Sequence, residues 1–131
     1  MSWIDFLNAD RGLAEVFGGP LLRSPAIVLH ELTLHRDGPR ARLRFDLVEF
    51  PVDPPAKWAA ASCNTVQVTV EAAGGLDVLE VSGFTMSGEV VAGLDDLADG
   101  RRELTLLSTD MRARIVSRHF RVATISAHRQ E

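Results

Sequence analysis

Two histidines and two carboxylates lie within residues 30–37 and offer the chain's clearest candidate for metal chemistry. They are His30, Glu31, His35 and Asp37. Imidazole and carboxylate groups are the usual protein ligands of zinc. In a strand, however, His30 shares a face with Leu32, whereas His35 points to the opposite side. We therefore expect His30 to be a hydrogen-bonded residue in the core or at a barrel mouth, with a ligand role as the alternative.

An acidic segment at residues 95–100 has part of the composition of a calcium-binding loop. In a twelve-residue calcium loop that began at Asp95, the third and twelfth positions would be Leu97 and Leu106, which cannot coordinate a metal ion. The segment is therefore better interpreted as an exposed acidic loop. Its carboxylates are candidate contacts for a positively charged partner, and they belong to Asp95, Asp96 and Asp99.

Basic and aromatic side chains supply further candidates for partner binding. Arg40, Arg42 and Arg44 alternate along one predicted strand face. Such alternation is typical of a solvated face whose charges nearby glutamates balance, and the alternative is a basic patch that contacts a carboxylate-rich partner. Trp58 lies in a proline-rich segment, where it either covers an end of the core or anchors an interface.

The sequence lacks the motifs of common enzyme classes. It contains no Gly-x-Ser-x-Gly turn, no phosphate-binding loop and no dinucleotide glycine fingerprint. Cys63 has no basic neighbour in sequence that would favour its thiolate. We therefore expect neither catalysis nor a bound cofactor or metal, although a site assembled from distant residues is not excluded by motifs alone.

Length, charge and cysteine content narrow the class of protein. The 131 residues, of which 46% are hydrophobic and 24% charged, suit one globular domain spanning residues 1–131. A net charge of −4 argues against nucleic acid as a partner. No apolar run is long enough to span a membrane, and a single cysteine fits a reducing cytoplasm. We expect a cytoplasmic protein.

Hydrophobic periodicity predicts one or two short N-terminal helices followed by strands. Apolar residues recur at helical spacing in residues 2–17, where Ser2 and Asp5 can cap the start and Gly18-Gly19-Pro20 can end the helix. After Pro25 the period becomes two. Prolines within residues 50–58 predict an extended crossover rather than a central strand.

Three turn sequences predict three hairpins with defined registers. The expected turns are Arg36-Asp37-Gly38-Pro39, Gly74-Gly75 and Thr109-Asp110. The first turn places Leu34, Leu32, His30 and Val28 opposite Ala41, Leu43, Phe45 and Leu47. The second places Val70 and Val68 opposite Leu79 and Val81, and the third places Leu106 and Leu104 opposite Ala113 and Ile115. About eight strands result, which favours a mainly β fold arranged as an antiparallel two-sheet sandwich or a partly open barrel.

Several stretches of the sequence resemble the Immunity protein 50 family of bacterial polymorphic toxin systems. They are Leu29–Arg40, Leu43–Leu47, Pro54–Trp58 and Asn64–Val68, with Trp3-Ile4-Asp5 and Ile125-Ser126-Ala127 similar to the family's ends. The resemblance implies a protein that binds and neutralises a cognate toxin domain without catalysis. It implies a protein partner and assigns no site residues. The alternative from the residues themselves is a small-molecule-binding or hydrolytic β domain with a pocket near His30.

Overall fold

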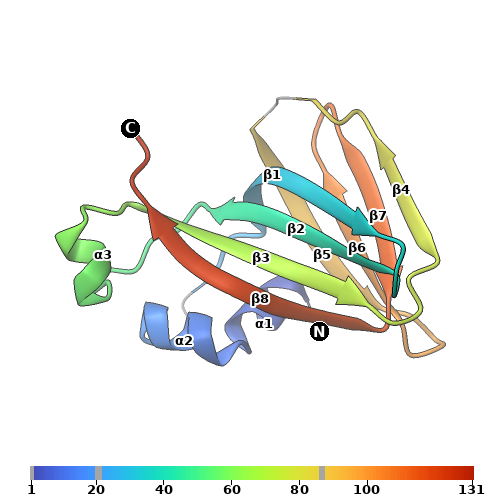
Figure 1. The fold of residues 1–131 in the computed structure, drawn as a ribbon, viewed down its shortest axis with the longest axis horizontal. Helices are drawn as coiled ribbons and strands as arrows, with labels where there is room; N and C mark the ends of the chain where they lie inside the picture. The colour runs from blue at the N-terminus through green and yellow to red at the C-terminus, as the bar shows by residue number, and fades with distance from the viewer. Residues whose placement is uncertain (1, 20–21, 86–87) are drawn as a thin grey trace.

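The computed structural model describes residues 2–19, 22–85 and 88–131, which form short helices and an extensive antiparallel sheet (Figure 1). The helices are α1 (Trp3–Asn8), α2 (Arg11–Phe17) and α3 (Ala56–Ala60). The strands are β1 (Ala26–His35), β2 (Arg40–Leu47), β3 (Thr65–Ala73), β4 (Val78–Ser82), β5 (Glu89–Asp96), β6 (Arg102–Leu107), β7 (Arg112–Ser117) and β8 (His119–His128). The mainly β class and the two short N-terminal helices are confirmed.

The eight strands form one sheet in the order β4-β7-β6-β5-β1-β2-β3-β8. Its end strands, β4 and β8, do not pair with each other, so the sheet does not close into a barrel. The pairing of β1 with β5 comprises three residue pairs, at Ala26–Val28. Figure 1 shows the sheet dividing there into one half made of β1, β2, β3 and β8 and another made of β5, β6, β7 and β4. The expected antiparallel strands thus lie in one open sheet rather than in two.

The N-terminal helices pack against the apolar inner face of this sheet. The Ser2 hydroxyl accepts a hydrogen bond from the Asp5 backbone N–H, and the Asp5 carboxylate accepts one from the Ser2 N–H, which is the expected capping box. Gly18 ends α2 in the left-handed conformation, while Pro20 falls outside the described residues. The Trp3 ring lies between Phe6 and Phe45, with centroid distances of 5.5 and 5.6 Å.

The first hairpin follows the predicted register until a β-bulge at His30. Leu34 pairs with Ala41 and Leu32 with Leu43, as expected. Beyond the bulge, Phe45 pairs with Leu29 instead of His30. The predicted pairings of His30 with Phe45 and of Val28 with Leu47 are therefore wrong. The extra residue lets Ile27 and Leu29 take the inward positions and moves His30 off the core face.

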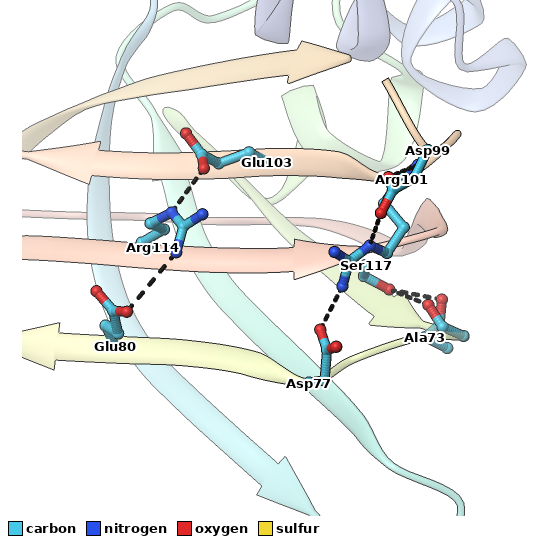
Figure 2. Close-up of polar contacts among 9 residues, drawn as sticks. Ala73, Asp77, Glu80, Asp99, Arg101, Glu103, Arg114 and Ser117 are labelled. Carbon is cyan, nitrogen blue, oxygen red and sulfur yellow. Dashed lines mark hydrogen bonds and ion pairs between the residues drawn. The ribbon is translucent and has the colours of Figure 1, made fainter. Parts of the chain in front are cut away.

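The predicted hairpin at Gly74-Gly75 is also wrong, although both glycines have the positive φ angles that such a turn uses. β3 pairs with β2 and β8, whereas β4 pairs with β7 at the far edge. The Ser117 hydroxyl donates hydrogen bonds to the carbonyls of Ala73 and Gly74 at 2.6 and 3.0 Å, which holds this crossing in place (Figure 2). β8 forms nine residue pairs with β3 and buries Phe120, whereas Leu79 of β4 stays 36% exposed. The longer strand therefore takes the position expected for β4.

The third predicted hairpin is confirmed, since Leu106 pairs with Ala113 and Leu104 with Ile115. The proline-rich crossover differs from the expected extended chain because it contains the single-turn helix α3, whose N-cap position is Pro55. A proline at a helix start loses no internal hydrogen bond, so the segment can make one turn there. No helix in the described ranges has the length and hydrophobicity needed to cross a bilayer.

Candidate partner-binding face

The outer face of the half-sheet made of β1, β2, β3 and β8 is polar. Along each strand, apolar side chains point into the core and the polar side chains between them point outward. On β2, for example, Ala41, Leu43 and Phe45 are buried in the core while the residues between them point outward. The registers place the outward side chains in adjacent rows across the four strands. They belong to Glu31, Thr33, Arg42, Arg44, Asp46, Gln67, Thr69, Glu71, Arg121 and Thr124.

A buried carboxylate in this face is shared by two arginines from different strands. Glu71 on β3 is 8% exposed, and its two oxygens accept hydrogen bonds from Arg42 Nε at 2.8 Å and Arg121 Nη2 at 3.1 Å. The Arg42 hydrogen bond lowers the pKa of Glu71 most, and Arg121 adds to this effect against the opposing effect of burial. Glu71 is therefore a carboxylate that fixes both arginines across β2, β3 and β8.

A hollow of about 440 Å³ opens beside this arrangement. Its lining consists of Glu31, Thr33, Arg42, Arg44, Thr69, Arg121, Ala123 and Thr124. We call it the arginine hollow. Arg44 also approaches Glu31, with 3.6 Å between Nη2 and Oε2, so all three guanidinium groups are held near carboxylates. The hollow is therefore a preformed concave surface with charged and hydroxyl-bearing walls.

Replacing Glu71 with glutamine is expected to lower the free energy of unfolding by about 1–2 kcal/mol near neutral pH. The carboxylate's folded-state pKa is depressed, so its contribution is complete above the unfolded-state pKa of about 4.3 and disappears as pH falls through the lower folded-state value. Urea denaturation of both proteins between pH 7 and pH 3 should show the difference shrinking on acidification. Glu31→Gln, at an exposed pair, should change stability by less than about 0.5 kcal/mol. A constant E71Q effect across this pH range would contradict the assignment.

A second polar cluster surrounds Asp46 on the same outer face. Asp46 is 2% exposed, and its carboxylate accepts hydrogen bonds from His30 Nε2 at 2.7 Å and Gln67 Nε2 at 3.1 Å. His128 Nε2 lies 3.7 Å from the same carboxylate. Within the described parts of the chain, no group of three His, Cys, Asp or Glu residues could hold a metal ion. The hydrogen-bonded interpretation of His30 matches this geometry, with the bulge placing the ring outside the core.

A larger hollow of about 530 Å³ lies beside His30, where β1 leaves β5. Its walls are mainly apolar and consist of Val28, Leu29, His30, Phe84, Thr85, Gly88, Val90 and Met111. The acidic neighbour of His30 is Asp46, which lies on β2 and does not line this hollow. The alternative of a small-molecule site near His30 stays a prediction.

Two further residues predicted from the sequence lie apart from each other, Arg40 at the start of β2 and Trp58 on α3. Arg40 starts β2, opposite His35 and Ala73, and its Nε is buried without a hydrogen-bond partner among the described residues. Trp58 is half-buried on α3, with its ring 6.3 Å from that of Phe50 and packed against the core. This packing agrees with a role in covering the core end. A partner contact at Trp58 stays a prediction.

The three predicted acidic residues lie at the β5–β6 turn, in the other half of the sheet, and are not brought together with Arg40 or Arg42. Asp96 pairs with Arg102 at 3.2 Å. Asp99 pairs with Arg101, whose backbone N–H and then guanidinium lower the pKa of Asp99. Asp95 lies opposite Glu103. Local arginines therefore balance much of the negative charge that the sequence suggested was available for a partner.

The face described above contains residues that sequence reasoning missed, namely Asp46, Glu71 and Arg121. The alternation of side chains along a strand could have placed Asp46 and Glu71 on an outer face, because each comes directly after an inward-pointing apolar residue. The contact of Arg121 with Glu71 depends on the pairing of β8 with β3, which the mistaken Gly74-Gly75 hairpin concealed.

Comparison with protein families adds a finding that covers most of the sequence. The model of the family described as Immunity protein 50 matches residues 11–128. The chain belongs to this family. The matched range includes all eight strands, so the Immunity protein 50 assignment extends over the whole sheet and over the arginine hollow. Comparison with curated proteins and comparison with solved structures each find no match to the chain.

Proposed function

We propose that this Immunity protein 50 family member binds and neutralises a cognate bacterial toxin domain, without catalysis of its own. The observation that carries the proposal is the family match over residues 11–128. The partner is a protein domain, and the protected compartment is the cytoplasm of the producing cell. Neutralisation in this form needs a surface that blocks the toxin's active site or holds its fold in an inactive state.

The outer face of β1, β2, β3 and β8 is the surface that best supports such binding. It carries arginines, which are enriched at protein interfaces, and its guanidinium groups are held in place before a partner arrives. It also spans four adjacent strands, which is broad enough to contribute to a specific complex burying about 1,200–2,000 Å² in total. A rigid polar face of this kind suits recognition of another folded domain.

The proposal is tested with a candidate toxin domain taken from the genes adjacent to the gene for this chain. Purified together, the two should elute as one complex from a sizing column, with a dissociation constant in the nanomolar range or below. Cells expressing the toxin domain alone should stop growing, and coexpression of this chain should restore growth. A failure of both binding and protection against that toxin domain would remove the proposal.

A further inference from the structure

We infer that the arginine hollow is a preformed receptor for a carboxylate side chain of the partner, with Arg42 and Arg121 as its two donors. The inference deepens the proposed function and rests on it for the identity of the partner as a toxin domain. The first observation is the balance of positive and negative charges around Glu71. One buried carboxylate binds two guanidinium groups there, so the cluster carries one positive charge more than its own chain balances.

The remaining donors of these arginines are free to face a ligand. Arg42 uses its Nε and Arg121 its Nη2 for Glu71, and neither guanidinium makes another hydrogen bond within the described part of the chain. The Arg42 and Arg121 side chains stay 45% and 62% exposed, while that of Glu71 is 10% exposed. The anchor is therefore buried and the unused N–H groups lie toward solvent. Both arginines line the hollow.

Two other clusters on the chain show the reverse ratio, with two carboxylates around one arginine. Arg114 lies between Glu103 at 2.6 Å and Glu80 at 3.6 Å, and Arg101 lies between Asp99 and Asp77 (Figure 2). In both cases two carboxylates surround one guanidinium, so no positive charge is left for a partner. Arg42 and Arg121 differ from these two clusters in sharing a single acid, which leaves one positive charge at the arginine hollow.

The chemistry of the hollow fits a carboxylate better than a nucleic acid. Two guanidinium groups fixed by one anchor can donate paired hydrogen bonds to the two oxygens of an Asp or Glu side chain. Glu31 stands in the same wall, and the whole chain carries a net charge of −4, so a polyanion would be repelled beyond the contact itself. The expected occupant is therefore one acidic side chain on a loop or strand of the toxin domain.

The test measures how matched arginine substitutions change the affinity of this chain for the candidate toxin domain named above. R42Q/R121Q should weaken the complex by about 30-fold or more and reduce its dependence on salt. R114Q removes an arginine that its own chain saturates, so it should change affinity by less than about 3-fold. Because R42Q/R121Q leaves Glu71 without partners, R42K/R121K serves as a second variant that keeps the charges and loses the planar fork, with an expected weakening of about 5-fold. Circular dichroism and thermal melting verify that each variant is folded.

A probe that does not depend on the toxin separates failure of the inference from failure of the proposed function. Titration of the full chain with a tetraglutamate peptide should shift the NMR signals of the Arg42 and Arg121 side chains and leave that of Arg114 in place. If the wild type binds the toxin domain and R42Q/R121Q binds within about 2-fold of it, the carboxylate receptor is overturned while the proposed function stands. If the wild type does not bind the toxin domain, the proposed function fails. The peptide titration then tests by itself whether the arginine hollow binds carboxylates. Absence of peptide shifts, or stronger shifts with a single-stranded oligonucleotide, would overturn it.

Discussion

Replacing Trp3 with alanine is expected to lower the free energy of unfolding by about 3–5 kcal/mol, which is typical for removal of a fully buried large aromatic side chain. Trp3 is 1% exposed and lies between Phe6 of α1 and Phe45 of β2. α1 has only six residues and cannot be stable by itself, so its position depends on this packing. Urea denaturation monitored by far-ultraviolet circular dichroism measures the loss.

Trp3→Phe is the matched control for this prediction. The indole Nε1 of Trp3 is buried and has no hydrogen-bond partner among the described residues, so phenylalanine removes an unpartnered polar group while retaining an aromatic ring. The W3F loss should therefore be less than half of the W3A loss. If W3A lowered stability by under 1 kcal/mol, the helices would not be docked through this side chain as described.

Local chemistry predicted most elements of the fold because each depends on neighbouring residues. The Ser2–Asp5 capping box starts α1 and the left-handed Gly18 ends α2, as the residue types require. The third hairpin keeps a strict alternation on both sides of its turn, so one register satisfies both faces. These features can be read without knowing where the rest of the chain lies.

The misplaced pairing of β3 had a different cause. Gly74 and Gly75 suit a tight turn, and β3 and β4 both have apolar residues at alternate positions, so their local patterns agree with a hairpin. The same inward positions of β3 also suit β8, which is twice as long as β4. The choice between the two is decided by total buried surface, which depends on strands separated by about 50 residues in sequence. The candidate site inherited this error, because Arg42 was predicted in a row with Arg40 and Arg44 on β2, whereas Arg121, which shares Glu71 with it, comes from β8.

The bulge at His30 was missed for a related reason, since one inserted residue leaves the pattern of apolar letters almost unchanged. A period of two assigned His30 to the inner face beside Leu32. The structure instead places its ring next to the buried carboxylate of Asp46. The compensation for the bulge is thus a polar contact between two strands, and sequence parity within one strand cannot reveal it.

Replacing Asp46 with leucine is accordingly expected to lower the free energy of unfolding by about 2–4 kcal/mol. The substitution removes the acceptor for both His30 Nε2 and Gln67 Nε2 at a position that is 2% exposed, which leaves the Gln67 amide without its partner. Asp46→Asn keeps an oxygen for Gln67 and a polar atom for the His30 ring, so its loss should be smaller. A double-mutant cycle of D46L with H30A, each of which removes the His30–Asp46 contact, should give a coupling energy of at least about 0.5 kcal/mol by urea denaturation. If His30 faced the core as the unbroken register predicts, D46L would leave stability unchanged or raise it, and the cycle would show additive losses.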